Sequence, residues 1–399
     1  MKIGVPCETA LGERRVALVP DNVKRLLGKG HTVIVEAGAG EQAGSADAAY
    51  RAAGAEMADD FASLLDRAEV VVKVRVPSPS EAAALREGQA IVGLLQPMVN
   101  LERIEALRAG GITSFSLDAL PRITRAQSMD VLSSQATVAG YRAVILGAQY
   151  LPKLFPLLMT AAGTLAPARV LILGAGVAGL QAVATAKRLG AQVQAFDTRP
   201  AVKEQVESLG ATFLTLPLTV EAAETAGGYA RQLDRDLEAR ERELLAEPVA
   251  LADVVVSTAM VPGARAPQLI SAEMVATMKA GSVILDLAAE GGGNCALTQP
   301  GERVVASNGV VIEGATDLPS QVAIHASQLY GHNMQEFLGL LLQAGVRELE
   351  DHRREWTLTE DEILQATCIT HAYRIQHGPT LERITARGGD AVVVEQSHP

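Results

Sequence analysis

The fold is decided by the stretch Arg169-Val170-Leu171-Ile172-Leu173-Gly174-Ala175-Gly176-Val177-Ala178-Gly179, an apolar run that leads into a GxGxxG pattern. A strand, a glycine turn and then a helix are typical of a dinucleotide-binding βαβ unit. Gly174 permits the tight turn, Gly176 lets the backbone approach a pyrophosphate, and Gly179 lets the helix pack closely. The helix N-terminus, at Val177 and Ala178, adds partial positive charge. A glycine turn without a ligand is the alternative interpretation.

The strand expected after this helix ends at Asp197, 18 residues beyond Gly179. An acidic side chain in this place accepts hydrogen bonds from the ribose hydroxyls of adenosine and repels the 2′-phosphate of NADP. Thr198 and Arg199 follow directly and are further candidate cofactor-binding residues. Arg199 could instead receive a 2′-phosphate, so NADP is the alternative to the NAD that we predict.

The rest of the chain alternates short β-rich runs with helical patterns. We expect strands at 2–5, 32–36, 70–75, 90–95 and 112–116, and then at 169–173, 192–196, 212–216, 253–257, 282–286 and 310–313. The βαβ rhythm predicts parallel pairing. The predicted fold is therefore α/β, with two Rossmann-like, doubly wound parallel-sheet domains joined by two long crossover helices, at about 124–142 and 327–350. Residues 1–136 plus 328–399 would form the N-terminal domain, closed by the C-terminal segment, and residues 137–327 the NAD(H)-binding domain.

The composition agrees with this class of fold. Hydrophobic residues make up 48% of the 399 and aromatic residues only 3%, as in parallel sheets whose cores are filled by small and branched aliphatic side chains. The net charge of -11 opposes binding to nucleic acid or to an anionic membrane surface. Cys7, Cys295 and Cys368 lie far apart, which indicates neither a disulfide framework nor a metal site, and a reducing cytoplasm fits best.

Three segments lie outside this alternation. We expect no export, because residues 1–6 lead into a strand without a secretory signal. Residues 143–166 are apolar but interrupted by polar residues and prolines, so we predict a buried helix rather than a membrane span. Residues 231–247 mix both signs of charge, which predicts a solvated helix, with a docking surface as the alternative. Residues 356–399 are predicted to be a polar tail, with His371 and His377 at the surface.

Two segments of the first domain carry a resemblance to a known family. Residues 12–20, GERRVALVP, resemble the N-terminal signature of the family shared by transhydrogenase NAD-binding components and alanine dehydrogenases, and the resemblance extends over nearly the whole chain. Residues 122–135 resemble the loop that marks the transhydrogenase branch. The resemblance implies that Arg122, Asp130 and Ser133 hold the nicotinamide carboxamide and that Gln127 reaches toward a second nucleotide.

The spacing of three of these residues has a simple helical interpretation. Gln127, Asp130 and Ser133 recur every three residues, which would place them on one helical edge. The alternative is that Asp130 and Ser133 merely cap the helix that begins there.

Further segments of the second domain resemble the same branch. They are 227–230, whose Tyr229 would close over the nucleotide, 257–259 with Ala259, 261–263 with Pro262, 286–294 with Glu290, and 314–319. For 227–230 an ordinary hairpin turn is the alternative. Gly291 and Ala315 depart from the expected pattern, but neither change removes a functional group.

The other branch of the family needs acid/base chemistry that this sequence lacks. Alanine dehydrogenases use Lys, His and Asp, and the corresponding positions here are Arg75, Gln96 and Glu290. A glutamine cannot titrate, whereas direct hydride transfer between two nicotinamides needs no proton donor. Arg15 could still anchor a carboxylate, and a surface ion pair is an equal possibility. An amino-acid dehydrogenase of the alanine or saccharopine type and a non-catalytic NAD sensor are therefore the alternative functions.

The resemblance implies the NAD(H)-binding component of a proton-translocating, Re/Si-specific NAD(P)+ transhydrogenase. NADH held between the domains would pass a hydride to NADP+ on a separate beta subunit, while a membrane-embedded subunit moves protons. It further implies a homodimer that is peripheral on the cytoplasmic face of the bacterial inner membrane, with no metal.

Overall fold

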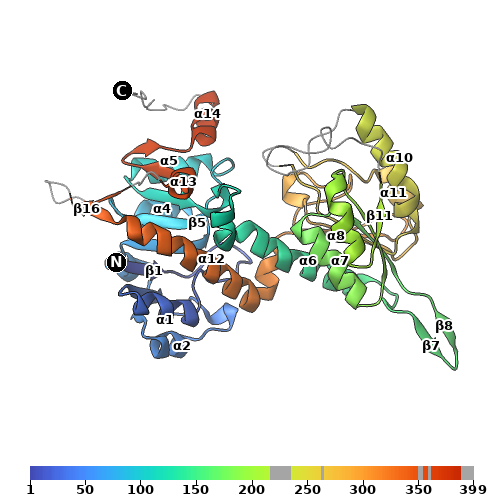
Figure 1. Ribbon diagram of the computed structural model, residues 1–399, viewed down its shortest axis with the longest axis horizontal. Helices are drawn as coiled ribbons and strands as arrows, with labels where there is room; N and C mark the ends of the chain where they lie inside the picture. Colours follow the sequence, from blue (N-terminus) through green and yellow to red (C-terminus); the bar gives the residue numbers. More distant parts are fainter. Residues whose placement is uncertain (216–234, 262–264, 349–353, 358–360, 388–399) are drawn as a thin grey trace. The chain divides into compact units, whose positions relative to one another are not determined.

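The computed structural model describes residues 1–215, 235–261, 265–348, 354–357 and 361–387. Its two compact units are Met1–Gln135 with Val322–Pro399, and Ala136–Gln321 (Figure 1). The chain passes from the first unit to the second inside α6 (Val131–Tyr150) and returns just before α12 (Ala323–Ala344). Each unit is built on a mainly parallel sheet, which confirms the predicted α/β class.

The first unit contains an eight-stranded sheet in the order β19-β18-β6-β5-β4-β1-β2-β3. The six strands from β6 to β3 are parallel, whereas β18 and β19 are antiparallel to their neighbours. The strands are β1 (Lys2–Val5), β2 (Thr32–Glu36), β3 (Glu56–Ala58), β4 (Val70–Arg75), β5 (Ala90–Leu94), β6 (Thr113–Ser116), β18 (Cys368–His371) and β19 (Arg374–Ile375). A separate hairpin joins β16 (Val346–Glu348) to β17 (Arg354–Trp356).

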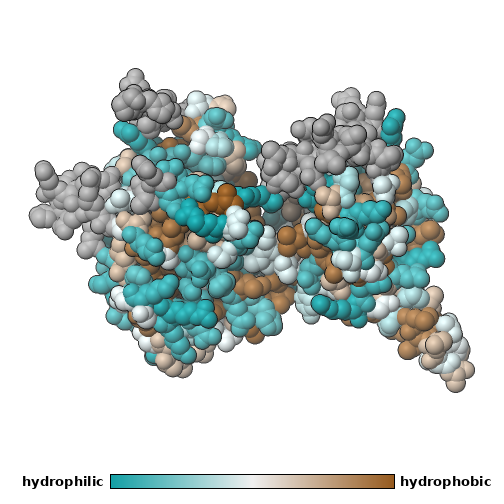
Figure 2. All heavy atoms as spheres, viewed as in Figure 1, coloured by the Kyte–Doolittle hydropathy of each residue, from teal (hydrophilic) through white to brown (hydrophobic). Residues whose placement is uncertain are grey.

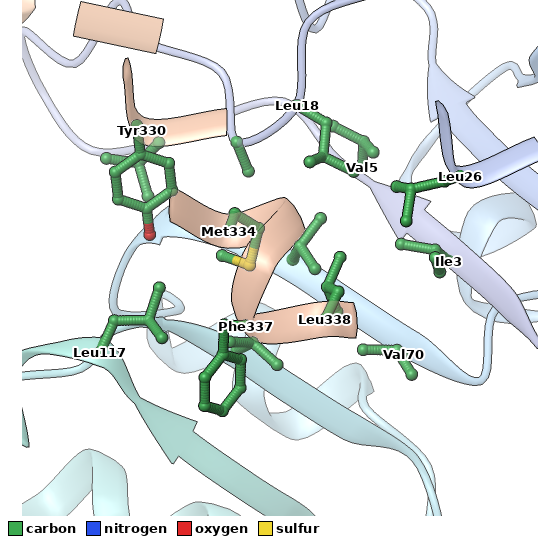
Figure 3. Close-up of a cluster of buried hydrophobic side chains, with 14 of the residues drawn as sticks. Ile3, Val5, Leu18, Leu26, Val70, Leu117, Tyr330, Met334, Phe337 and Leu338 are labelled. Carbon is green, nitrogen blue, oxygen red and sulfur yellow. The ribbon is translucent and has the colours of Figure 1, made fainter. Parts of the chain in front are cut away.

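Helices flank this sheet, and α12 supplies much of its core. Figure 3 shows Tyr330, Met334 and Phe337 of α12 pointing into a cluster with strand residues, where all three are fully buried. The Phe337 ring meets the Phe115 ring edge to face, with centroids 5.8 Å apart. The other helices are α1 (Pro20–Gly28), α2 (Asp47–Ala53), α3 (Phe61–Leu65), α4 (Pro79–Ala84), α5 (Leu101–Ala109), α13 (Glu362–Thr367), α14 (Gly378–Ala386), and the short 3-10 turns η1 (Glu41–Ala43), η2 (Leu117–Ala119) and η3 (Thr124–Met129).

The second unit contains a seven-stranded sheet in the order β11-β10-β9-β12-β13-β15-β14, which is parallel except for β14. Its strands are β9 (Arg169–Leu173), β10 (Gln192–Phe196), β11 (Thr212–Leu214), β12 (Val254–Ser257), β13 (Val283–Asp286), β14 (Arg303–Val305) and β15 (Val311–Gly314). Its helical segments are α7 (Val177–Arg188), α8 (Lys203–Ser208), α10 (Arg235–Leu251), α11 (Ala272–Thr277), η4 (Pro200–Val202), η5 (Ala289–Gly291) and, at the boundary between the units, η6 (Leu318–Val322).

The prediction of one buried helix over 143–166 is wrong beyond Tyr150. Residues after α6 form a hairpin of β7 (Leu158–Thr160) and β8 (Gly163–Leu165) that projects from the second unit (Figure 1). Pro152 and Pro156, whose rings fix φ and remove an N–H donor, end the helical pattern. Apolar residues remain exposed here, with Met159 at 75% and Leu165 at 53%, and Figure 2 shows this apolar surface at the base of the projection.

The predicted polar tail is also wrong for the described residues beyond 361. Ile363 and Leu364 of α13 and Cys368 of β18 are fully buried, and β18 adds to the edge of the first sheet beside β6. Small runs of apolar residues in an otherwise polar segment carry this packing. His371 and His377 are half-buried and bond to Thr113 and Thr380, respectively.

Two helical predictions need smaller corrections. The second crossover helix, expected over 327–350, is α12 and ends at Ala344. Of the segment 231–247, residues from Arg235 on form α10, whereas residues 231–234 lie outside the described part of the chain. This helix is not solvated on every side, since Glu241, Leu245 and Val249 are buried at helical spacing.

Candidate functional site

The glycine turn of the second unit is shaped by contacts that leave no room for side chains. Gly174 follows β9 with a φ of 93°, and a Cβ there would lie 2.7 Å from Thr258 Oγ1. A Cβ on Gly179 would lie 1.8 Å from the carbonyl oxygen of Gly174. A Cβ on Gly176 would meet no atom closer than Nη2 of Arg199, at 3.9 Å, so the backbone at the N-terminus of α7 is open to a ligand. This arrangement can admit an anionic group to the backbone amides of the turn.

A glycine that the sequence analysis did not single out supports the same turn. Gly140 lies within α6, and a Cβ on it would lie 2.0 Å from the carbonyl oxygen of Ala178. Glycine inside a helix costs roughly 1 kcal/mol relative to alanine, which is a signal in the sequence that a packing reason exists.

Asp197 stands at the end of β10 and is 6% exposed. Its Oδ2 accepts a hydrogen bond from the backbone N–H of Ala175 in the glycine turn, at 2.7 Å. Its two oxygens also accept from Arg199, with Nε to Oδ1 at 2.9 Å and Nη2 to Oδ2 at 2.8 Å. The Oγ1 of Thr198, between them, is buried without a hydrogen-bond partner among the described residues. The orphaned hydroxyl and the open turn both fit a polar ligand at this end of the strand.

The strand end beside this turn is fixed by Asn294, which the sequence analysis did not assign a role. Its side-chain amide hydrogen-bonds to both backbone groups of Ala259, accepting from the N–H at 3.1 Å and donating to the carbonyl oxygen at 2.9 Å. Asn294 is itself held by Asp286, whose Oδ2 accepts from the Asn294 N–H at 2.7 Å. Asp286 is fully buried, and its oxygens also accept from Ser257 and Thr298. The backbone at Ala259 is therefore held in one place.

The remaining candidates of the second unit are Glu290, Tyr229 and Pro262. Glu290 is in η5 and is exposed. Residues 227–230 with Tyr229, and Pro262, lie outside the described residues.

In the first unit, residues 122–135 do not form one helix. Arg122 and Gln127 are exposed, with Gln127 in the 3-10 turn η3, and the chain leaves the helical region at Asp130, where ψ is 88°. The predicted common helical edge is therefore wrong. Asp130 instead accepts from Ser133, at 2.9 Å from its N–H and 2.6 Å from its Oγ, which is the capping arrangement considered above.

Asn333 of α12 holds this segment from both sides of the break. Its Nδ2 donates to the carbonyl oxygen of Ser128 at 2.7 Å, and its Oδ1 accepts from Ser134 Oγ at 2.6 Å. Asn333 is buried, so it fixes the segment rather than meeting solvent.

Arg15 and Arg75 are committed to a buried carboxylate. Arg15 donates through Nε and Nη2 to Glu13 at 2.8 and 2.6 Å and through Nη1 to Gln135 at 2.9 Å, while Arg75 Nε lies 3.0 Å from Glu13. The surface ion pair considered for Arg15 is wrong, because Arg15 is 4% exposed. Burial alone would raise the pKa of Glu13, but hydrogen bonds from Arg15 and the two positive charges outweigh it and lower the pKa to about 2.

At another position compared with the amino-acid dehydrogenases, Gln96 carries no titratable group. Gln96 is exposed, with a φ of 47°. Lys73, two residues before Arg75, is 1% exposed and pairs with Glu81 at 2.7 Å and Glu8 at 3.6 Å. No group of three His, Cys, Asp or Glu side chains among the described residues could hold a metal ion. No helix in the same part of the chain has the length and apolar character needed to span a bilayer.

Comparisons with known proteins cover both units. The profile "Alanine dehydrogenase/PNT, N-terminal domain" matches residues 4–139, and "Alanine dehydrogenase/PNT, C-terminal domain" matches residues 143–378. The chain is 47% identical over 383 residues to an NAD(P) transhydrogenase alpha-subunit polypeptide of Rhodospirillum rubrum, covering 94% of this chain and 98% of that one. It is 31% identical to an alanine dehydrogenase of Halomonas elongata, with coverages of 94% and 98%. The crystal structure of transhydrogenase from Sinorhizobium meliloti superposes with a TM-score of 0.81 at 39% identity, covering 95% of this chain and 99% of that one.

Proposed function

The chain belongs to the alanine dehydrogenase/PNT family, and from this premise we propose that it is the NAD(H)-binding component of a proton-translocating NAD(P)+ transhydrogenase. The observation that carries the choice of branch is the higher identity, at equal coverage, to the transhydrogenase alpha subunit than to the alanine dehydrogenase. The reaction we propose is Re/Si-specific hydride transfer between NADH on this chain and NADP+ on a separate subunit.

In this proposal the second unit holds the adenosine and pyrophosphate. Gly174, Gly176, Val177, Ala178 and Gly179 would place backbone amides and the α7 N-terminus against the pyrophosphate. Asp197 would accept from the ribose hydroxyls, with Thr198 and Arg199 beside it. The open backbone at Gly176 supports this assignment. Ala259, Pro262, Glu290 and Tyr229 complete the proposed cofactor-binding set.

The nicotinamide would be held by residues of the first unit. Arg122 would donate to the carboxamide oxygen and Asp130 would accept from the carboxamide NH2, which suffices to fix the rotation of that group. Ser133, whose hydroxyl donates to Asp130 at 2.6 Å, would join them by holding the carboxylate in place. Gln127, which is exposed, would reach toward the second nucleotide. The hydride comes from the bound nucleotide, so the protein's part is to orient the ring and exclude water. The commitment of Arg15 and Arg75 to Glu13 supports a reaction without a substrate carboxylate.

We also propose that the chain works as a homodimer on the cytoplasmic face of the bacterial inner membrane, with a membrane-embedded subunit and an NADP(H)-binding beta subunit. The name "subunit alpha" of its relatives implies further subunits in those proteins. The exposed apolar side chains of the β7-β8 hairpin support contact with another protein chain, because monomers rarely expose such a patch.

The test is stopped-flow transfer of hydride from NADH to an NADP+ analogue. The protein alone should show none, and the mixture with a recombinant NADP-binding component should show fast transfer that collapses in Gln127→Asn. NADH binding without transfer in the mixture would contradict the proposal and favour a sensor. Ammonia-dependent oxidation of NADH with a 2-oxo acid, by this chain alone, would instead identify an amino-acid dehydrogenase.

A further inference from the structure

A buried ion pair of the first unit has no part so far in the proposed transfer of hydride. Glu13 and Arg15 are 5% and 4% exposed, and the guanidinium donates to the carboxylate through Nε and Nη2 at 2.8 and 2.6 Å. Two charges taken out of water are stable only where their geometry and their remaining hydrogen bonds are good. A pair bound this closely is a fixed point to which other segments can be anchored.

A further donor of Arg15 reaches the start of α6. Its Nη1 donates to Oε1 of Gln135 at 2.9 Å, and Gln135 is 7% exposed. The amide nitrogen of Gln135 donates in turn to the carbonyl oxygen of Ala326 in α12, at 3.1 Å. Gln135 therefore joins segment 13–15 to α12 through an amide whose acceptor and donor are both engaged.

The position of Gln135 in α6 matters for the proposed nicotinamide site. The helix begins at Val131, directly after Asp130, whose carboxylate accepts from the N–H and the hydroxyl of Ser133. Backbone hydrogen bonds join residues four apart in a helix, so its first turn moves as one piece. An anchor at Gln135 therefore fixes Asp130 and Ser133 as well.

We propose that Gln135 is a positioning residue for hydride transfer, which relays the fixed position of the Glu13–Arg15 pair to Asp130 and Ser133. The inference rests on the proposed function, in which Asp130 and Ser133 belong to the nicotinamide site. Transfer between two C4 atoms depends on such an anchor, because a misplacement of about 1 Å can cost about a hundredfold in rate.

A second buried amide of the same unit provides the matched control. Gln89 is also 7% exposed, and its side chain accepts from one backbone N–H and donates to two backbone carbonyl oxygens. It precedes β5, at the amino end of the parallel strands, whereas residues 122–133 follow β6, at the carboxyl end. Gln89→Met and Gln135→Met thus remove comparable amides, but only Gln135→Met breaks the relay.

The experiment measures single-turnover hydride transfer from NADH to an NADP+ analogue by stopped flow, in the mixture with a recombinant NADP-binding component at saturating nucleotide. Gln135→Met should slow transfer about tenfold. Its dissociation constant for NADH should change by less than about threefold, since the second unit holds the adenosine and pyrophosphate in the proposed function. Gln89→Met should lower the melting temperature to a similar extent but leave the rate within about twofold of the wild type.

Arg15→Lys tests the relay from its other end. A lysine keeps the charge that Glu13 requires, but its compact ammonium cannot replace a planar fork that donates in several fixed directions. Arg15→Lys should slow transfer about as much as Gln135→Met does. The double variant should be slower than the slower single variant by no more than about twofold, because both changes break the same chain of contacts.

Three results would overturn the inference: a rate for Gln135→Met within about twofold of the wild type, equal slowing by Gln89→Met, or single effects that multiply in the double variant. If Gln135→Met does not fold, Gln135→Asn, which is one methylene too short to span both partners, replaces it. Failure of the proposed function appears separately, as a wild-type mixture that transfers no hydride. Wild-type transfer with any of the three results would refute only the role of Gln135.

Discussion

Replacing Glu13 with Gln should change how the stability of the protein depends on pH. The folded-state pKa of Glu13 is about 2 against an ordinary value of 4.5, so its charged form favours the folded state. For a lowered pKa the stabilisation is fully present above about pH 4.5 and is lost as the pH falls toward 2. The difference is worth roughly 3 kcal/mol at neutral pH, and about 2 kcal/mol of it should disappear between about pH 5 and pH 3.

The assay is urea unfolding at several pH values between about 3 and 7, for the wild type and for Glu13→Gln. The variant should be less stable at neutral pH, because Arg15 and Arg75 lose their buried counter-charge, and its curve should be flatter between about pH 5 and pH 3. Glu56→Gln is the matched control: its carboxylate also pairs with an arginine, Arg67, but is 55% exposed, so the wild-type slope should persist. Parallel curves for the wild type and Glu13→Gln would refute the reasoning.

Three other changes have clear expected outcomes. Gly140→Ala should lower the free energy of unfolding by about 1 to 3 kcal/mol, because the added Cβ would lie 2.0 Å from a backbone carbonyl oxygen of α7. Gly339→Ala, in α12, is the control and should be neutral or slightly stabilising, with both variants measured by thermal or urea unfolding. Asn294→Ala should weaken NADH binding and lower stability by roughly 1 to 3 kcal/mol in titration and melting, since both polar backbone groups of Ala259 lose their partner. Asn294→Asp should be at least as destabilising, because it turns a carboxylate oxygen toward the carbonyl oxygens of Ala259 and Pro267 at a fully buried position. Met159→Ser should shift the protein toward monomer in sedimentation velocity without changing its melting temperature, because this side chain is 75% exposed; an unchanged dimer would argue against the hairpin as the contact.

The sequence was most informative where periodicity and local turn chemistry agree. The strands at 2–5, 32–36 and 70–75 have the predicted bounds, because short runs rich in Val and Ile, bounded by polar residues, Pro or Gly, have few other stable arrangements. The break at Asp130 could not be read from spacing alone. Polar residues at a three-residue spacing predict one edge of a helix. The same spacing also arises where the helix is interrupted, because Asp130 caps the next helix by accepting from Ser133, three residues on.

The errors have a common physical origin. The hairpin at 158–165 carries apolar residues on a projecting surface, and β18 is buried within a polar segment, so in both places the local composition disagrees with the burial that tertiary contacts impose. Asn294 and Asn333 were missed because a side-chain amide that fixes distant backbone leaves no local pattern. Gly140 was the exception, since a glycine inside a helix is itself a signal.

Two buried side-chain amides, Asn294 in the second unit and Asn333 in the first, each hold a backbone segment of the candidate site in place. Asn294 bonds to both backbone groups of Ala259, and Asn333 bonds to both sides of the break at Asp130. Neither amide titrates, and each keeps a backbone in one position. Acid/base catalysis would require a group that gains and loses a proton, whereas hydride transfer between two nucleotides depends on how rigidly each ring is held. The proposed reaction therefore requires side chains that hold the backbone in place rather than side chains that titrate. Variants of Asn294 or Asn333 should slow hydride transfer without altering how its rate depends on pH.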